Sequence, residues 1–235
     1  MRITCLGDSL TYGNVGYSYI DFLDKSIHAV NKGKNGDTVR GARRRLEKIL
    51  NQSKFDSPIY VVGIGTNDLL LPYLRTVSLF WFVMMGIRCK VKACIQKDLQ
   101  FSREYEELLS LLSKNEKRVI VFGQPFINLR NFPHEDLIKR NAIIKKLADQ
   151  YGFPFIDIFH LQKERIEKDT RVYTWKHSFF LRVIDAIIMS LAPSTKDTFA
   201  KRRGLTTSVD GAHFHSNSAK LLAKEVEKHL LKIRV

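Results

Sequence analysis

The first fourteen residues, MRITCLGDSLTYGN (1–14), place a short apolar run directly before Gly-Asp-Ser-Leu. The run from Arg2 to Leu6 is mostly apolar and is bounded by Gly7, a pattern typical of a buried strand that opens an α/β domain. Ser9 then follows the carboxyl end of that strand. Ligands bind at this edge of a parallel sheet because the loops leaving the strands form a crevice there. A turn with a helix-capping serine is the alternative interpretation of the same residues.

Four later segments also have the composition of buried strands, and amphipathic helical patterns lie between them. The runs IYVVGI and RVIVF are apolar and largely β-branched, which suits strands covered on both faces. This alternation predicts a parallel sheet with helices on both sides. The predicted strands are Arg2–Leu6, Ile27–Asn31, Pro58–Ile64, Arg118–Phe122 and Phe153–Ile158, and the predicted helices are Thr38–Leu50, Glu104–Leu112, Leu137–Tyr151 and Ser216–Lys232.

Composition and length predict a single globular domain over residues 1–235. The chain is 44% hydrophobic and 27% charged, and it shows no internal repeat or low-complexity linker. It contains no run of roughly 18 uncharged apolar residues, and its first residues lack the layout of a secretory signal. We therefore expect a cytoplasmic protein.

The three cysteines, Cys5, Cys89 and Cys94, are expected to be free buried thiols. Their number is odd, and Cys5 lies inside the first predicted strand, which does not suit a disulfide framework. No second Cys or His pair accompanies Cys89 and Cys94 at a spacing suited to structural zinc, so no metal site is predicted.

The chain is strongly basic, with a formal net charge of +15. A surplus of this size favours an anionic partner: nucleic acid, a phospholipid surface, an acidic polymer or an acidic substrate. Solubility alone is the competing explanation. The arginines of RGARRR (40–45) fall mainly on the exposed side of an amphipathic helix, which argues against a nucleic-acid reader, whereas an anionic membrane remains a candidate for peripheral contact.

Two segments interrupt the alternation and are predicted to be inserts, at about 69–97 and 170–205. The first concentrates aromatic and Met residues beside basic ones, and the second contains TWKHSFFLRVIDAIIMSLAP and ends in KRRG. Long inserts in compact domains are often lids or binding loops. Three interpretations stay open for them: packing in the core or between the copies of a homo-oligomer, a cap over an apolar pocket, and a surface that touches lipid.

Three further polar clusters stand where the predicted strands or the last loop end. NKGKNGDT (31–38) follows the second strand, GIGTND (63–68) follows the third, and VDGAHFH (209–215) precedes the last helix. In a parallel sheet these places face one crevice. The sequence therefore predicts that the clusters form one site together with Ser9.

In these blocks the chain resembles the SGNH hydrolases, also called GDSL-type esterases and lipases. The four blocks occur in order and span the chain from end to end. The resemblance implies a three-layer α/β/α sandwich of the flavodoxin-like type and a serine hydrolase without a cofactor. The matching residues are Gly7-Asp8-Ser9-Leu10 for the nucleophile block, Gly36 for the glycine block, Gly65-Thr66-Asn67-Asp68 for the asparagine block and Asp210-Gly211-Ala212-His213 for the Asp-x-x-His block.

The chemistry of serine acyl transfer matches these residue types. It needs an activated hydroxyl, a base, a group that orients the base, and donors aimed at the developing oxyanion. Ser9 is the predicted nucleophile, His213 the base and Asp210 its orienting partner. The predicted oxyanion donors are the backbone N–H groups of Ser9 and Gly36 and the side-chain amide of Asn67. Taken alone, each block is equally typical of a turn or a helix cap.

The last block departs from the His-Pro-Asn continuation common in the family, because it reads His213-Phe214-His215. His215 is therefore a second candidate for the base, although the spacing from Asp210 favours His213. Asp8 and Asp68 are interpreted as supporting or capping groups. The remaining histidines have no motif around them and are expected to be solvated or packed: His28, His134, His160, His177 and His229.

The substrate is less determined than the chemistry, because this fold hosts several ester-cleaving activities. The apolar inserts beside basic residues favour a lipophilic acyl ester, including a lysophospholipid. A carbohydrate O-deacetylase, an acyltransferase and a noncatalytic lipid- or nucleic-acid-binding protein are the alternatives.

Overall fold

The computed structural model describes residues 1–52, 54–166, 173–175 and 179–233. Five parallel strands form one sheet in the order β2-β1-β3-β4-β5. Gly7 at the end of β1 is in register with Gly33 of β2 on one side and Gly63 of β3 on the other. The chain therefore changes direction across the sheet at β1 and β3, the position where ligands bind in open α/β folds. The strands are β1 (Arg2–Gly7), β2 (His28–Gly33), β3 (Ile59–Gly63), β4 (Arg118–Phe122) and β5 (Phe155–Ile156).

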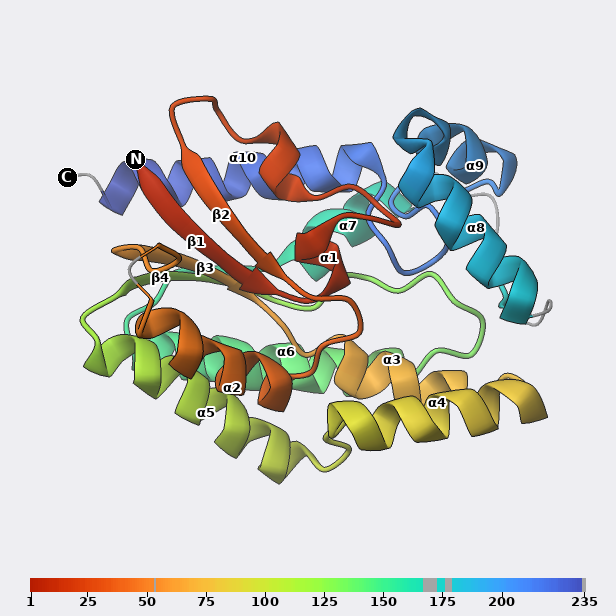
Figure 1. Cartoon of the computed structure of the whole chain (residues 1–235), viewed down its shortest axis with the longest axis horizontal. Coiled ribbons are helices and arrows are strands. Elements are labelled where there is room, and N and C mark those ends of the chain that lie inside the picture. Colours follow the sequence, from red (N-terminus) through yellow and green to blue (C-terminus); the bar gives the residue numbers. More distant parts are fainter. Residues whose placement is uncertain (53, 167–172, 176–178, 234–235) are drawn as a thin grey trace.

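Helices cover both faces of the sheet, which confirms the predicted three-layer α/β/α sandwich (Figure 1). On one face, α2, α5 and α6 enclose a core that includes Leu46, Phe101 and Ile144. On the other, α10 packs with η1 around Tyr19 and Val226. The described helices are α1 (Ser9–Tyr12), η1 (Tyr19–Phe22), α2 (Val39–Leu50), α3 (Asn67–Leu74), α4 (Leu79–Lys92), α5 (Asp98–Lys114), α6 (His134–Gln150), α7 (Ile158–Ile166), α8 (Phe179–Leu191), η2 (Pro193–Thr195), α9 (Lys196–Arg202) and α10 (Ser216–Ile233).

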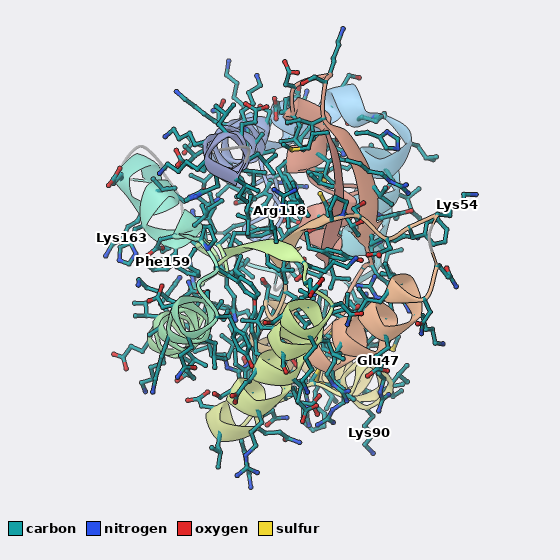
Figure 2. The ribbon with its side chains drawn as sticks, turned by 90° about the vertical axis from the view of Figure 1, so that its left-hand side faces the viewer. Glu47, Lys54, Lys90, Arg118, Phe159 and Lys163 are labelled. Atoms are coloured by element: carbon teal, nitrogen blue, oxygen red, sulfur yellow. A yellow bond between two sulfur atoms is a disulfide. The ribbon has the colours of Figure 1, made fainter. Side chains whose placement is uncertain are left out.

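The outer faces of the predicted amphipathic helices that cover the sheet carry charged side chains. Figure 2 shows charged side chains such as Glu47, Lys54 and Lys163 on the periphery of the layers. On α2, Arg40 and Arg43 both pair with Glu104 of α5, at 2.7 and 3.0 Å. These pairs join neighbouring helices over the buried apolar stripe.

The fifth strand is shorter than the predicted Phe153–Ile158. Only Phe155 and Ile156 pair with β4. Asp157 ends the strand because its carboxylate accepts the backbone N–H of His160 at 3.1 Å and so caps the start of α7. The apolar residue Ile158, which the pattern assigns to the strand, is the first residue of that helix.

The expectation of three free thiols is wrong for two of them. The structure pairs Cys89 with Cys94 in a disulfide, whereas Cys5 is free and buried. The pairing arises because α4 ends at Ala93 in a left-handed conformation (φ 53°), which turns the chain back and brings the two Cα atoms to 5.1 Å. Burial raises the pKa of the Cys5 thiol to about 12.

The two predicted inserts form helices at one end of the molecule. The first contains most of α3 and all of α4, and the second contains α8, η2 and α9, with residues 170–172 and 176–178 outside the described part. Figure 1 places α4 and α8 at the same end, beyond the carboxyl edge of the sheet. Among the described residues, no helix has both the length and the apolar composition needed to cross a membrane.

Candidate active site

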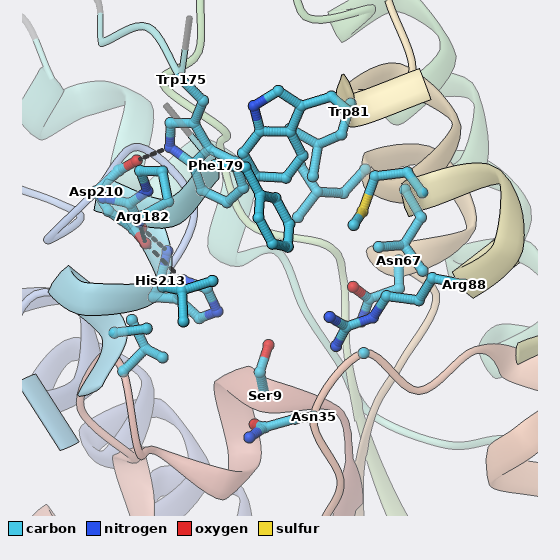
Figure 3. Close-up of a pocket in the computed structure, with 18 of the residues that line it drawn as sticks. Ser9, Asn35, Asn67, Trp81, Arg88, Trp175, Phe179, Arg182, Asp210 and His213 are labelled. Atoms are coloured by element: carbon cyan, nitrogen blue, oxygen red, sulfur yellow. Dashed lines mark hydrogen bonds and ion pairs between the residues drawn. The ribbon is translucent and has the colours of Figure 1, made fainter. Parts of the chain in front are cut away.

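The predicted site residues line one cavity of about 260 Å³ at the carboxyl edge of the sheet. Ser9 is the first residue of α1, directly after β1, and Asn67 is the first residue of α3, soon after β3. Gly36 lies in the loop between β2 and α2, and Asp210 and His213 lie in the loop before α10. Figure 3 shows Ser9, Asn67, Asp210 and His213 around a common space. The parallel topology thus brings together blocks that are far apart in sequence.

Asp210 holds the His213 ring in one orientation. The buried Asp210 carboxylate lies 2.9 Å from His213 Nδ1 through Oδ2, and its Oδ1 accepts the backbone N–H groups of His213 and Ala212 at 2.9 and 3.1 Å. With Nδ1 facing the carboxylate, Nε2 is left for the cavity. Figure 3 shows the His213 ring and the Ser9 side chain facing the same space. Among the described residues, none is hydrogen-bonded to the Ser9 hydroxyl.

Arg182 of α8 is a second partner of Asp210, and it was not predicted from the sequence. Its Nη2 donates to the same Oδ2 atom at 2.6 Å, and its guanidinium stacks over the Trp175 ring at 4.7 Å. Trp175 in turn donates from Nε1 to the Asp210 carbonyl at 2.7 Å. Burial by itself raises the pKa of Asp210, but His213 and Arg182 outweigh burial and hold that pKa well below its usual range. Arg182 and Trp175 stand in no motif, so no signal in the sequence singled them out.

Two backbone N–H groups in the cavity are available to a ligand. Ser9 begins a helix, where the first N–H groups have no partner within the helix. Gly36 has a φ of 65°, a conformation that glycine adopts without steric cost. In the described part of the chain neither N–H is paired with a protein acceptor. Free N–H donors are the kind of group that an oxyanion requires.

The Asn67 amide differs, because its nitrogen already has two acceptors. It donates to the carbonyl of Asp37 at 3.0 Å and to Asp8 Oδ2 at 3.3 Å. The longer bond, to Asp8, is the weaker of the two. A ligand atom in the cavity therefore competes with Asp8 for this donor.

Asp8 and Asp68 support the loops of the site, as the sequence analysis proposed. Asp8 caps α1 by accepting the N–H of Leu10 at 2.9 Å. Asp68 accepts the N–H groups of Val39 and Ile95 at 3.0 and 2.8 Å, so it ties the start of α2 to the segment after α4. Burial raises the pKa of both carboxyl groups to about 7.

The inserts build the rest of the cavity wall. Trp81 and Met85 of α4 and Phe179 of α8 line it, together with Trp175. The Trp81 ring lies 5.0 Å from Phe179 and 5.5 Å from Trp175, so these aromatic rings form a continuous apolar side. Asn35 and Arg88 contribute polar groups to the wall, and Figure 3 shows both on the side of Ser9 and Asn67.

The other described histidines lie outside this cavity. His215, the second candidate for the base, lies with Asp197 at the start of α10, its Nε2 3.3 Å from that carboxylate. His134 contacts the Ile127 carbonyl at 2.8 Å and stacks on Phe126. His28, His160 and His229 are also absent from the cavity wall, and His177 lies outside the described residues.

The described residues include no group of three or more His, Cys, Asp or Glu side chains arranged to hold a metal ion. The chemistry that the cavity supports is acyl transfer. It offers a hydroxyl, an imidazole oriented by a carboxylate, and N–H donors at the edge of one apolar cavity.

Known structures share the fold along nearly the whole chain. A lipase/acylhydrolase from Enterococcus faecalis is 18% identical, with a TM-score of 0.60 over 97% of this chain and 94% of that one. The acetyl xylan esterase AlAXEase is 17% identical, with a TM-score of 0.62 over 97% and 99%. An acetyl-xylooligosaccharide esterase from Geobacillus is 17% identical, with a TM-score of 0.62 over 97% and 92%.

A search of curated proteins found no significant match. The sequence model of the GDSL-like lipase/acylhydrolase family, in contrast, matches residues 5–176, which include the Ser9, Gly36 and Asn67 blocks. The Asp210–His213 block falls beyond that match, and the structure brings it to the same cavity. The chain therefore belongs to the GDSL-like lipase/acylhydrolase family.

Proposed function

We propose that this protein is a serine ester hydrolase in which Ser9 is the nucleophile, His213 the general base and Asp210 the group that orients His213. One observation carries the proposal: the Asp210–His213 pair, held by three contacts to one carboxylate, opens onto the cavity that Ser9 also lines. The missing Ser9–His213 bond does not argue against it, because catalytic hydrogen bonds are often long before substrate binds.

The reaction proceeds in two halves. Ser9 Oγ attacks the acyl carbon while His213 Nε2 takes the hydroxyl proton, and the protonated ring then gives that proton to the leaving alcohol. This leaves an acyl group on Ser9. Water attacks the acyl-enzyme with His213 again as the base, and the carboxylic acid leaves. Asp210 stabilises the protonated ring in both halves.

The negative oxygen of each tetrahedral intermediate is stabilised by the N–H groups of Ser9 and Gly36 and by the Asn67 amide. The first two donors are free of protein acceptors in the described structure. Asn67 joins them by exchanging its 3.3 Å bond to Asp8 for a bond to the oxyanion. Loss of one such donor typically costs about 100- to 1,000-fold in turnover.

The acyl group of the substrate is lipophilic, because the wall opposite the polar donors is built from Trp81, Trp175 and Phe179. The volume of about 260 Å³ is slightly below the roughly 300–1,000 Å³ range of small-molecule pockets. We therefore expect a short or medium acyl chain to be preferred over a long one.

Hydrolysis of p-nitrophenyl acetate, butyrate, octanoate and palmitate by the wild type and by Ser9→Ala tests the proposal. Ser113→Ala, on the exposed face of α5, is the matched control. We expect cleavage that disappears in Ser9→Ala, persists in Ser113→Ala and is fastest below the palmitate length. Equal activity in Ser9→Ala and the wild type would exclude the serine mechanism. Cleavage restricted to acetylated sugars would identify a carbohydrate O-deacetylase instead.

A further inference from the structure

Arg88 projects from insert helix α4 to the rim of the cavity without a counter-ion. Its guanidinium lies against Gly36, so closely that a Cβ at that position would collide with it. Figure 3 shows it directed toward Ser9 and Asn35. Arg88 is exposed at this rim, and in the described part of the chain no carboxylate lies within ion-pair distance of it.

The neighbours of Arg88 increase this excess of positive charge. Lys92, one turn further along α4, donates to the Asn35 carbonyl at 3.3 Å and has no acidic partner among the described residues. Burial lowers the pKa of Lys92, the nearby Asp37 raises it, and the nearby Lys34 and Arg88 lower it. The nearby carboxylate of Asp37 is engaged with Arg45 at 2.7 Å. We call Lys34, Arg88 and Lys92 the cationic rim.

We propose that the cationic rim, with Arg88 at its centre, binds an anionic group carried by the ester substrate close to the scissile carbonyl. This inference rests on the proposed function and names the substrate class: an amphiphilic ester with a phosphate or a carboxylate. Arginine suits the task because its fork of N–H donors matches both anions. The anion lies at Arg88, beside the Gly36 donor, and the acyl chain lies along Trp81 and Phe179.

A matched pair of esters tests this assignment by activity. Phenyl butyrate and 3-carboxyphenyl butyrate have the same acyl group, and only the second carries a carboxylate, which is on its alcohol part. 1-Octanoylglycerol and its 3-phosphate form the corresponding pair for phosphate. We expect Arg88→Gln to lower kcat/KM for the anionic members by about 10- to 100-fold, as for a lost hydrogen bond to a charged group, and to change the neutral members by less than about twofold.

Lys90→Gln is the control, because Lys90 is exposed on the same helix but does not line the cavity. We expect it to leave both members of each pair unchanged. An equal loss for neutral and anionic esters in Arg88→Gln would show that Arg88 acts on the oxyanion instead. No loss for either would also overturn the proposal. The pair that responds decides between carboxylate and phosphate.

Binding without turnover separates this proposal from the proposed function. Both tryptophans of the chain, Trp81 and Trp175, line the cavity, so their fluorescence reports its occupancy. Titration of Ser9→Ala with octyl phosphate should give saturable quenching of this fluorescence. Adding Arg88→Gln should weaken the affinity for octyl phosphate about tenfold and leave the affinity for octyl glucoside unchanged. Arg88-dependent binding without any esterase activity would overturn only the proposed function. Esterase activity that needs Ser9 but ignores Arg88 would overturn only the anion subsite.

A second inference concerns the outer faces of α4 and α8, on either side of the cavity. These faces carry large apolar side chains in water: Leu79 is 81% exposed, Leu191 80% and Phe180 64%, and Phe80 and Ile184 are also exposed. The Phe80 ring lies 5.2 Å from Phe179 and 5.6 Å from Phe180, so the two helices meet and the surface is continuous. We call these five exposed residues the apolar crest.

We infer that the apolar crest docks on an anionic membrane. Contiguous apolar surface of this kind marks an interaction site. Helix α4 carries Arg88, Lys90 and Lys92 and no acidic residue, and the acidic residue of α8, Asp185, is paired with Arg182 and Arg203. The whole chain has a net charge of +15. An apolar surface beside unbalanced positive charge matches the interface of a bilayer that contains anionic lipid.

Co-sedimentation with vesicles tests the docking. We expect the wild type to bind phosphatidylglycerol vesicles, to bind phosphatidylcholine vesicles far less, and to lose roughly tenfold in partitioning when both Leu79 and Leu191 are changed to Glu. Leu231→Glu is the control, because Leu231 is 62% exposed on α10, away from the crest. Absence of binding to either vesicle would overturn the inference. A dimer in sedimentation equilibrium that the double variant dissociates would instead assign the crest to a second copy of the chain.

Discussion

The two sides of the cavity differ in how their residues are specified. On the sheet side, Ser9, Gly36 and Asn67 each follow the end of a parallel strand within a few residues. On the insert side, Trp81, Arg88 and Arg182 lie on helices that no motif marks. The sheet side holds the groups proposed for bond making and breaking, and the insert side holds those that select and position. Bond making and substrate selection are therefore assigned to different sides of the cavity. Substitutions on the sheet side should lower kcat for all esters, and substitutions on the insert side should change the preference among esters.

Asp210→Asn on the sheet side should produce the largest effect. The substitution keeps the size of the side chain but removes the charge that orients and stabilises His213, for which the expected loss in kcat is about 10,000-fold. Rates for p-nitrophenyl butyrate, with circular dichroism to verify folding, measure this. A loss of kcat below tenfold in a folded variant would show that catalysis does not need Asp210. It would also contradict the assignment of bond making to the sheet side.

Arg182 lies on the insert side but contacts Asp210, so its substitution tests whether the two sides of the cavity act separately. Arg182→Gln removes a positive charge 2.6 Å from the Asp210 carboxylate. Because the negative charge of Asp210 is then no longer shared with Arg182, Asp210 should stabilise the protonated His213 ring more strongly. We expect kcat near neutral pH to fall on the order of tenfold and the acid limb of the pH–rate profile to move to higher pH.

Arg182→Lys keeps the charge and should restore part of the original profile. A loss of thermal stability without movement of the acid limb would assign Arg182 a structural role only.

Phe179→Ala should change selectivity instead of chemistry. Phe179 lines the cavity and packs on Trp81 at 5.0 Å, so its removal widens the apolar side. We expect kcat/KM for octanoate to change by a few-fold to tenfold relative to acetate, in line with a few methylene contacts, while the acetate rate stays nearly constant. A uniform loss for all chain lengths would contradict the separation of the two sides.

Asp68→Asn should have the smallest effect on activity and a measurable effect on stability. Burial raises the pKa of Asp68 from an ordinary value of 3.8 to about 7. The folded state therefore holds this proton more tightly than the unfolded state. The resulting stabilisation is fully present below pH 3.8 and is lost as pH rises through about 7.

The free energy of unfolding in urea, measured between pH 5 and 8, should fall with pH by on the order of 2–3 kcal/mol more in the wild type than in Asp68→Asn. Parallel curves would show that Asp68 does not carry this dependence. Asp68 joins the sheet-side helix α2 to the segment after insert helix α4, so this measurement reports how far the contact between the two sides contributes to stability.

The strands and four of the helices, α2, α5, α6 and α10, were predictable from sequence because buried parallel strands and amphipathic helices leave strong periodic patterns, whereas the other described helices were not predicted. Arg118–Phe122 is predicted and observed with identical bounds, and α2 differs by one residue. The fifth strand was overestimated because Phe153–Ile158 is apolar except for Asp157. The capping contact of Asp157 ends the strand and starts α7. The Cys89–Cys94 pairing was missed because it depends on the left-handed turn at Ala93.

The sequence by itself determined the three-layer sheet architecture and the convergence of Ser9, Gly36 and Asn67, because the carboxyl ends of parallel strands must meet at one edge. Asp210 and His213 follow no strand, and their place beside the other three was predicted from the loop before the last helix and from the family resemblance. Only the tertiary structure decided what surrounds them. Arg182 reaches Asp210 across 28 positions of sequence, and Arg88 reaches Gly36 from another helix. Such contacts follow from how whole helices dock on one another. Local periodicity shows which face of a helix is apolar, but it does not show which neighbour that face meets.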